Sequence, residues 1–271
     1  MARIGASSRV LAVMGDPVVH SLSPAMHNAA IAVLGLDAVY VAFRVPVGEL
    51  PGMLRACRAA GISGNLTIPL KVPALELVEQ ATPMAERAGA VNTFWPHDGA
   101  LHGDNTDVAG ITQALTALHA DSPWLLAGTG GTARAVAVAA AGCGAGLVIR
   151  SRDADRARAF AGWAGTLGVR ASPDDGQPIR TAINTTPRGL TADDPLPIPL
   201  DRLTGATAAL DLVYHPGETA WVRACRAAGL HAADGRTVLV AQGVHAFERF
   251  FPGTTAPRAV MEAAVRRALG D

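Results

Sequence analysis

Segments of β-branched and other apolar residues alternate with alanine-rich segments along the whole chain, and this alternation restricts the fold more than any other feature. Strands are predicted at residues 9–14, 39–45, 62–68, 123–127, 146–150, 181–184 and 209–214. Strands that alternate with helices are typical of α/β proteins, in which helices cover a mostly parallel sheet. We therefore expect an α/β fold.

Helix signals fill the intervals between these strands. Ser23-Pro24 predicts a helix with Ser23 as N-cap, and Pro69 predicts the start of another. Asp98-Gly99 predicts the turn of a hairpin. Further helices are expected at residues 47–60, 106–118, 154–167, 238–251 and 256–269, and directly after the glycines at 128–131.

Composition narrows the classes of partner. The chain has 271 residues, with 23 basic and 23 acidic side chains and a formal net charge of zero. A neutral chain without a basic block gives no reason to expect nucleic acid as a partner. No apolar run reaches the roughly 18 residues that span a bilayer, and no signal peptide is recognisable, so we expect no membrane partner.

Cysteine and histidine usage adds two expectations. The three cysteines, Cys57, Cys143 and Cys225, are far apart in the sequence and indicate free thiols in a reducing cytoplasm. His20 and His27 have no carboxylate or thiol cluster at metal-ligand spacing beside them, so we expect no metal site.

Lys71 is the only lysine of the chain, because 22 of the 23 basic residues are arginine. An arginine stays protonated at any working pH, whereas a lysine loses its proton when its surroundings favour the neutral amine. Four of the five asparagines are also clustered, each in an Asn-x-Thr or Asn-Thr pair: Asn65, Asn92, Asn105 and Asn184. A lysine on a solvated face is the plain alternative, but these clusters indicate residues placed for chemistry.

A glycine-rich turn follows the strand at residues 123–127. It reads Gly128-Thr129-Gly130-Gly131-Thr132-Ala133, and it precedes a helix. Such a turn lets the backbone approach a pyrophosphate, and the helix start offers free N–H groups and partial positive charge. The spacing is GxGGxA, so a plain glycine turn is the alternative, but the strand–turn–helix context favours a dinucleotide site.

The end of the following strand bears on the choice between NAD and NADP. NAD enzymes tend to place an acid there for the ribose 2′-hydroxyl, whereas this chain has Ser151 flanked by Arg150 and Arg152, with Arg156 one turn on. Arginine can fork onto a 2′-phosphate, which favours NADP. Asp153 opposes this reading if its carboxylate faces the same pocket.

Several motifs occur together in one order, and the chain resembles the shikimate dehydrogenase family through them. Among them is Gly-Asn-Leu-Thr-Ile-Pro-Leu-Lys at residues 64–71. The other matching segments are residues 15–28, 89–93, 103–110, 128–133, 183–187 and 211–214, together with Gln242.

The resemblance implies a fold, a reaction and a set of site residues. It implies an N-terminal α/β substrate domain at residues 1–106, a Rossmann-type doubly wound NADP-binding domain at residues 107–241, and C-terminal helices at residues 242–271 that return to the substrate domain. It implies reversible reduction of 3-dehydroshikimate to shikimate with NADPH, in chorismate and aromatic amino acid biosynthesis. The implied catalytic pair is Lys71 and Asp107.

The resemblance also assigns ligand-binding residues. Those implied for shikimate or 3-dehydroshikimate are Ser21, Ser23, Thr67, Lys71, Asn92, Asp107, Tyr214 and Gln242. Those expected at NADP are Gly128, Thr129, Gly130, Gly131, Thr132, Ala133, Ser151, Arg152, Arg156 and Thr185.

Proton chemistry agrees with the roles of Lys71 and Asp107. Hydride delivered to a carbonyl carbon leaves an alkoxide that needs a proton, and an adjacent ammonium can donate it. If a helix starts at Pro69, its positive end eases deprotonation of Lys71, while Asp107 orients the ammonium and stabilises its charged form. The alternative for this pair is a surface salt bridge.

Two other functions remain open at this point. One is a quinate/shikimate dehydrogenase that uses NAD, which would share the fold and the catalytic pair. The other is a ligand-sensing module that kept the fold and lost turnover. The retention of both Lys71 and Asp107 argues against the sensor. A homodimer is also left open.

Overall fold

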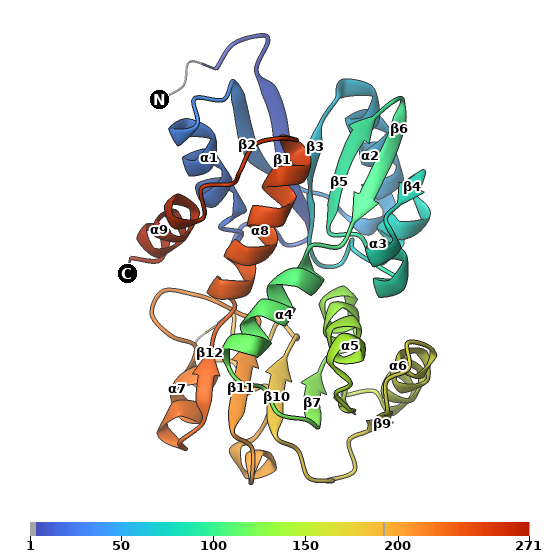
Figure 1. Ribbon diagram of the computed structural model, residues 1–271, viewed down its shortest axis with the longest axis vertical. Helices are drawn as coiled ribbons and strands as arrows, with labels where there is room; N and C mark the ends of the chain where they lie inside the picture. Colours follow the sequence, from blue (N-terminus) through green and yellow to red (C-terminus); the bar gives the residue numbers. More distant parts are fainter. Residues whose placement is uncertain (1–3, 192, 271) are drawn as a thin grey trace. The chain divides into compact units, whose positions relative to one another are not determined.

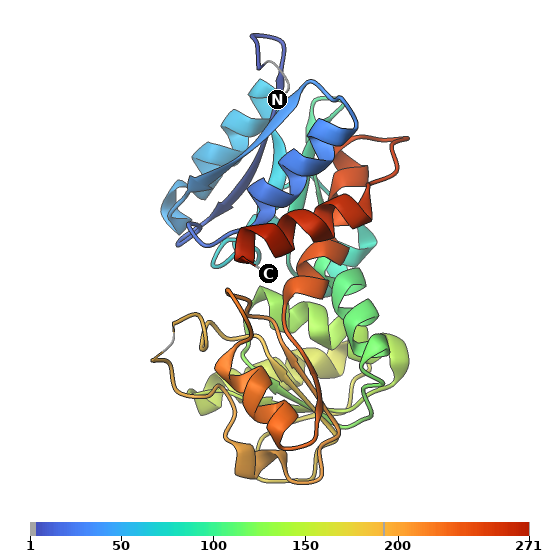
Figure 2. The same ribbon diagram turned by 90° about the vertical axis from the view of Figure 1, so that its left-hand side faces the viewer.

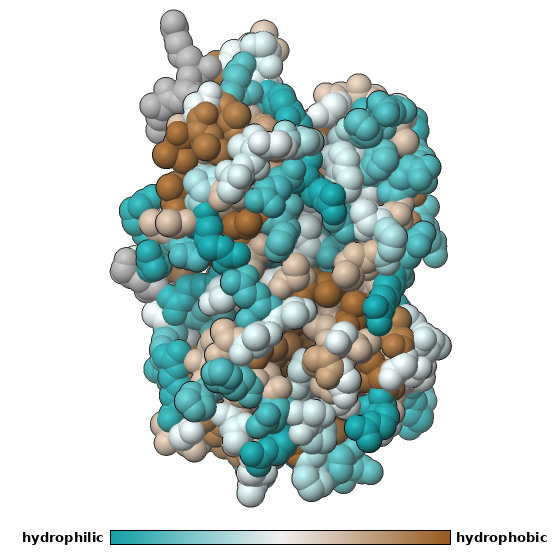
Figure 3. Space-filling view, in the orientation of Figure 1, coloured by the Kyte–Doolittle hydropathy of each residue, from teal (hydrophilic) through white to brown (hydrophobic). Residues whose placement is uncertain are grey.

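The computed structural model describes residues 4–191 and 193–270, and these form two compact units (Figure 1). One unit comprises residues up to Asp107 together with Leu239 onwards, and the other runs from Val108 to Val238. No helix within the described ranges is long and apolar enough to cross a membrane. Hydrophilic and apolar residues are interspersed on the face that Figure 3 shows.

The first unit is built on a mixed six-stranded sheet in the order β2-β1-β3-β5-β6-β4. Strands β1 to β3 are parallel, whereas β5 runs antiparallel to both β3 and β6. The predicted hairpin around Asp98-Gly99 is therefore confirmed. The strand bounds are β1 Arg9–Gly15, β2 Ala38–Arg44, β3 Ser63–Leu66, β4 Gln80–Ala81, β5 Thr93–His97 and β6 Ala100–Asp104.

Helices cover both faces of this sheet (Figure 2). Helix α2 buries Leu50, Leu54 and Cys57 in a core that also contains Met14 and Phe94. Helix α1 covers the opposite face and packs against α9. The helices are α1 Ser23–Val33, α2 Leu50–Ala60, α3 Pro83–Ala88, α8 Arg236–Phe250 and α9 Arg258–Leu269, with short 3₁₀ turns at Val47–Glu49 and Pro73–Glu76.

The second unit contains an all-parallel six-stranded sheet in the order β12-β11-β10-β7-β8-β9. The chain begins at β7, moves outward through β8 and β9, and then returns to place β10 beside β7. This is the doubly wound order of dinucleotide-binding domains, with its switch point between β7 and β10. The strands are β7 Trp124–Ala127, β8 Leu147–Arg150, β9 Ala171–Pro173, β10 Thr181–Asn184, β11 Ala208–Asp211 and β12 His231–Ala233.

Helices of this unit follow the strands in the expected alternation. They are α4 Asp107–Ala117, α5 Gly131–Cys143, α6 Ala154–Thr166 and α7 Ala220–Ala227, with a 3₁₀ turn at Leu200–Leu203. Its core includes Trp221, whose indole N–H donates to the carbonyl of Ile198 at 3.1 Å. The α/β fold predicted from the alternation is therefore confirmed.

Two local predictions are wrong. Ser23 is the first residue of α1 rather than its N-cap, which is Leu22, and the N-cap residue makes no side-chain capping hydrogen bond. No α-helix begins at Pro69. Instead, Lys71 lies in a turn between β3 and the 3₁₀ helix at Pro73, because its carbonyl accepts the backbone N–H of Val91 at 2.8 Å. A tertiary hydrogen bond outweighs the local proline signal there.

Candidate active site and cofactor loop

Lys71 and Asp107 form a close, largely buried ion pair in the first unit. Lys71 Nζ lies 2.6 Å from Asp107 Oδ2, and the two side chains are 13% and 8% exposed. The residues are 36 positions apart in sequence. An exposed ion pair contributes little, whereas a partly buried one has a defined geometry that a reaction can use. The surface salt bridge considered for this pair is therefore excluded.

Asp107 is positioned by the end of the β5–β6 hairpin and by the start of α4. It is the first residue of that helix, where the partial positive charge of the unpaired N–H groups stabilises a carboxylate. The helix end at this site thus favours the charge of Asp107. It does not assist deprotonation of Lys71, as the predicted helix at Pro69 would have done.

Asn92 binds the second carboxylate oxygen of Asp107. Its Nδ2 donates to Asp107 Oδ1 at 2.8 Å and to Thr106 Oγ1 at 3.0 Å, while its Oδ1 accepts the backbone N–H of Thr106 at 2.8 Å. Asn92 is 2% exposed. Because both of its polar atoms are committed, the amide cannot rotate without breaking several bonds, and the carboxylate of Asp107 is held in one orientation.

Gln242 joins this cluster from α8. Its Oε1 lies 3.5 Å from both Asn92 Nδ2 and Thr106 Oγ1, at the limit of hydrogen bonding, while its Nε2 donates to the carbonyl of Leu239 at 2.7 Å. The structure therefore brings Lys71, Asn92, Asp107 and Gln242 together from distant parts of the sequence, as expected from the motifs.

A buried chain of polar groups links Ser23 to the same cluster. The pKa of Tyr40 is raised well above its usual value by burial, and a hydrogen bond with Ser23 opposes that shift. The Tyr40 hydroxyl donates to Asn65 Oδ1 at 2.7 Å, and Asn65 Nδ2 donates to Thr93 Oγ1 at 2.9 Å. Thr93 then donates to Asn92 Oδ1 at 3.0 Å. Tyr40 and Thr93 were not among the predicted site residues. Thr93 could have been found from its Asn-Thr pair.

Ser21 and Thr67 are each two residues from a member of this chain of bonds, Ser23 and Asn65 respectively. Ser21 Oγ accepts the backbone N–H of Ser23 at 3.3 Å, just before α1. Thr67 directly follows β3, and a side chain at Gly15 would meet its methyl group at 2.3 Å. A glycine at position 15 thus lets the ends of β1 and β3 approach each other.

The glycine turn of the second unit has the geometry expected of a dinucleotide site. It connects β7 to α5 at the switch point of the sheet, beside the end of β10. Gly128 has φ +110°, and a Cβ there would lie 2.4 Å from Thr185 Oγ1. Thr185 itself donates to the carbonyl of Ala127 at 2.7 Å. Only glycine fits at this position.

The start of α5 remains open for an anion. Its N-cap is Gly130, which has no side chain to cap the first N–H groups, and a Cβ added there would meet nothing within 4 Å. Gly131 and Thr132 begin the helix, and Ala133, the next helical residue, is fully buried. A phosphate group suits this position because the helix start presents N–H donors and partial positive charge.

The loop after β8 contains charged residues that are bound to other protein groups and charged residues that are not. Arg150 donates to Asp174 Oδ2 at 2.8 Å, and Arg202 holds the other oxygen of Asp174, so Arg150 is engaged inside the unit. Asp153 caps α6, where its Oδ1 accepts the N–H groups of Asp155 and Arg156 at 2.9 and 3.1 Å. The carboxylate of Asp153 is thus hydrogen-bonded to the start of its own helix, which reduces its repulsion of a 2′-phosphate.

Arg152 and Arg156 are the two cations of the loop after β8 that remain available to a ligand. Both are exposed, and neither forms an ion pair with any residue in the described ranges. Ser151 lies between Arg150 and Arg152 and accepts the N–H of Asp153 at 3.2 Å. Two unpaired guanidinium groups and a hydroxyl beside a glycine turn suit a phosphorylated ribose.

Asp211 supports the loop that carries Thr185, a feature absent from the sequence prediction. It is fully buried and accepts hydrogen bonds from Asn184 Nδ2 and Thr219 Oγ1, both at 2.8 Å. Burial raises the pKa of Asp211, and these hydrogen bonds oppose the rise. Asn184 also donates to the carbonyl of Arg188 at 3.1 Å. The loop after β10 is therefore anchored by a buried polar network.

Tyr214 lies in the second unit, after the end of β11 and partly buried. Strand β11 ends at Asp211, three residues earlier than predicted. No group of three His, Cys, Asp or Glu that could hold a metal ion occurs in the described part of the chain.

Comparison with known proteins identifies the family. Residues 13–94 match the model described as shikimate dehydrogenase substrate binding domain, and residues 235–266 match that of the shikimate 5'-dehydrogenase C-terminal domain. A shikimate dehydrogenase (NADP(+)) from Thermus thermophilus is 41% identical over 262 residues, which cover 96% of this chain and 98% of that protein.

Solved structures agree. A shikimate dehydrogenase in complex with NADP+ superposes with a TM-score of 0.89 at 31% identity, covering 99% of this chain and 98% of the other. A Thermus thermophilus shikimate 5-dehydrogenase in complex with NADP(H) and shikimate gives 0.86 at 39% identity, covering 96% and 99%. The chain therefore belongs to the shikimate dehydrogenase family.

Proposed function

We propose that the chain catalyses the reversible NADP-dependent reduction of 3-dehydroshikimate to shikimate in chorismate biosynthesis. The observation that carries this proposal is the ion pair between Lys71 Nζ and Asp107 Oδ2, fixed by Asn92. Homologues about 40% identical over nearly the whole chain carry the same activity in their names, and a family structure binds both shikimate and NADP(H).

Lys71 acts as the proton donor and acceptor at the reacting oxygen. Bound NADPH supplies the hydride. The ammonium of Lys71 then gives its proton to the oxygen that becomes the hydroxyl. In the reverse direction its neutral amine removes that proton, and the carboxylate of Asp107, 2.6 Å away, stabilises the ammonium that forms.

The polar cluster around the pair binds and orients the ring substrate. We assign hydrogen bonds with its carboxylate and hydroxyls to Ser21, Ser23, Thr67, Asn92 and Gln242 of the first unit, and to Tyr214, which follows β11 in the second unit. Asn92 and Gln242 already lie within 3.5 Å of each other, so little side-chain entropy is lost when a substrate binds them. The unit that contains Lys71 is proposed as the substrate domain.

The second unit is proposed to bind NADP. The turn from Gly128 to Ala133, with Thr185 beside it, would receive the pyrophosphate, since Gly128 permits the close turn and the start of α5 is uncapped. Ser151, Arg152 and Arg156 would hold the 2′-phosphate. Asp211 and Asn184 keep the adjoining loop in place.

A matrix of two substrates and two cofactors tests this function. Shikimate or quinate is mixed with NADP+ or NAD+, and absorbance of the reduced nicotinamide is followed. We expect the highest kcat/KM for shikimate with NADP+. Faster turnover of quinate with NAD+ would favour the quinate/shikimate alternative, and binding of shikimate without turnover in any combination would favour a sensor.

Location and assembly are further parts of the proposal. The cysteines Cys57, Cys143 and Cys225 are all free thiols, which suits the reducing cytoplasm. A homodimer remains a prediction, and light scattering on the purified chain would test it.

A further inference from the structure

A groove in the first unit lies away from the catalytic cluster, at the opposite end of the sheet. It is lined by residues from the starts of β1 and β3, from β5 and from the end of α8: Arg9, Ser63, Trp95, Pro96, His97, Arg249, Phe250 and Pro252. Lys71 and Asn92, by contrast, follow the carboxyl end of β3 and precede β5. The groove has a volume of about 480 Å³, within the ordinary range of small-molecule sites.

The charge of the groove is positive. Its lining contains two arginines and no acid. Arg249 is balanced by Asp104, since its Nε and Nη2 lie 3.0 and 2.9 Å from Asp104 Oδ2. Arg9 donates to the carbonyl of Phe250 at 3.0 Å and pairs with no carboxylate among the described residues. An anion would therefore meet an uncompensated guanidinium.

Part of the remaining lining is aromatic, namely Trp95, His97 and Phe250. The Arg249 guanidinium lies over the ring of Trp95 at 5.6 Å, and that of Arg9 lies over Phe251 at 4.9 Å. Trp95 is only partly buried, and its indole N–H has no hydrogen-bond partner in the described ranges. A flat ring can stack in such a place while its charged group reaches the arginines.

From this combination we propose that the groove binds a small aromatic carboxylate. The carboxylate pairs with Arg9 and with the Nη1 side of Arg249, and the ring packs against Trp95. A bare inorganic anion would leave the aromatic wall unused, and an uncharged ring would leave Arg9 unpaired.

Arg249 connects the groove to the segment from Asp104 to Asp107. Asp104, which Arg249 holds, also accepts the backbone N–H of Asn105 at 2.8 Å, and Asp107 is two residues further on. A ligand carboxylate competes with Asp104 for this arginine and loosens the segment that positions Asp107. We therefore expect a bound ligand to lower kcat while the KM for shikimate stays unchanged.

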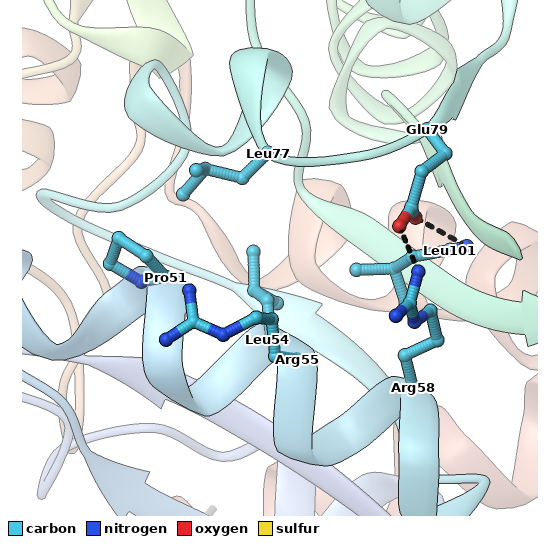
Figure 4. Close-up of a pocket in the computed structure, with 7 residues that line it drawn as sticks. All are labelled: Pro51, Leu54, Arg55, Arg58, Leu77, Glu79 and Leu101. Carbon is cyan, nitrogen blue, oxygen red and sulfur yellow. Dashed lines mark hydrogen bonds and ion pairs between the residues drawn. The ribbon is translucent and has the colours of Figure 1, made fainter.

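A second hollow of the same unit supplies a matched control. It lies between α2 and the segment that carries Leu77 and Glu79, and there Glu79 already neutralises Arg58 (Figure 4). Its other arginine, Arg55, lines that hollow as Arg9 lines the groove. Arg55→Gln thus removes one exposed arginine without touching the proposed site.

Calorimetry with benzoate tests the proposal, on enzyme saturated with shikimate so that the substrate site is filled. We expect binding with a dissociation constant of about 1 mM or below, weakened about tenfold by Arg9→Gln or Trp95→Leu and unchanged by Arg55→Gln. Phosphate and cyclohexanecarboxylate should bind more weakly than benzoate, and benzyl alcohol more weakly still.

Four results would overturn the proposal. Equal binding of phosphate or cyclohexanecarboxylate would show that the aromatic wall plays no part. Complete displacement of benzoate by shikimate would place it in the substrate site. Equal weakening by Arg55→Gln would show non-specific anion binding, and binding without any change in kcat would remove the link through Arg249. Because the first three results are binding measurements, they do not depend on turnover by the proposed reaction.

Discussion

The two units hold their functional charges in opposite ways. In the first, Lys71 and Asp107 are paired, nearly buried and fixed by Asn92 and Thr106. In the second, Arg152 and Arg156 are exposed and unpaired, beside an uncapped helix start. Groups that take part in a reaction gain from being fixed beforehand, whereas groups that only recognise a phosphate can order when it arrives. Substitutions of these charged residues should therefore affect turnover in the first unit and affinity in the second.

Lys71→Ala and Asp107→Asn should have the largest effects. Loss of a general acid–base group typically costs about 10²–10⁴-fold in rate. We expect a fall of that order in kcat for each, with a much smaller change in the KM for shikimate. The double variant should lose far less than the product of the two single losses, because the pair acts as a unit. A loss in the double variant equal to the product of the two single losses, with folding verified by thermal melts, would show that the two residues act independently.

Arg152→Ala should affect affinity instead. Removal of charge-assisted bonds to the 2′-phosphate should raise the KM for NADP+ by roughly 10- to 100-fold and leave that for NAD+ nearly unchanged. Arg158→Ala is the control, because Arg158 is already paired with Asp155 on the same helix. Equal losses for both cofactors after Arg152→Ala would place this arginine elsewhere than at the 2′-phosphate.

His27 lies in the first unit but does not take part in its network of polar hydrogen bonds. It stacks on Tyr40 at 4.4 Å, and both ring nitrogens are buried without a hydrogen-bond partner in the described structure. Burial lowers the pKa of His27 from 6.5 to about 3. Below pH 6.5 the unfolded chain therefore binds a proton that the folded chain does not, and stability is lost as the pH falls towards 3.

His27→Phe should remove this loss while keeping the stacked ring. At pH 5 we expect the variant to recover about 2 kcal/mol of the acid-induced destabilisation relative to pH 8, from about 1.4 kcal/mol per pH unit. Denaturant unfolding at the two pH values measures it. An equal stability difference between variant and parent at both values would show that His27 does not carry the acid sensitivity.

Gln242→Ala should have the smallest effect. Gln242 touches the cluster only at 3.5 Å, so we expect the KM for shikimate to rise about tenfold or less, with unchanged affinity for NADP+. A change confined to the cofactor would move Gln242 out of the substrate site.

Local patterns in the sequence predicted the strands of both sheets better than they predicted the segment around Lys71. The glycine turn and Asn-Thr pairs identified Gly128, Asn92 and the end of β6, because each needs a residue type that few positions accept. The prediction of a helix at Pro69 was wrong because a hydrogen bond from Val91, far along the chain, fixes the turn at Lys71. Similarly, the buried role of Asp211 depends on Asn184 and Thr219, which only the sheet brings together.

Lys71→Arg gives the most direct test of the account. Arginine keeps the positive charge beside Asp107 but cannot lose its proton, since its pKa lies far above any working pH. If Lys71 transfers a proton, kcat should fall by about 10²–10⁴-fold, nearly as far as in Lys71→Ala. A Lys71→Arg enzyme that folds normally and retains a kcat close to that of the parent would contradict the proposal that this residue performs the proton chemistry.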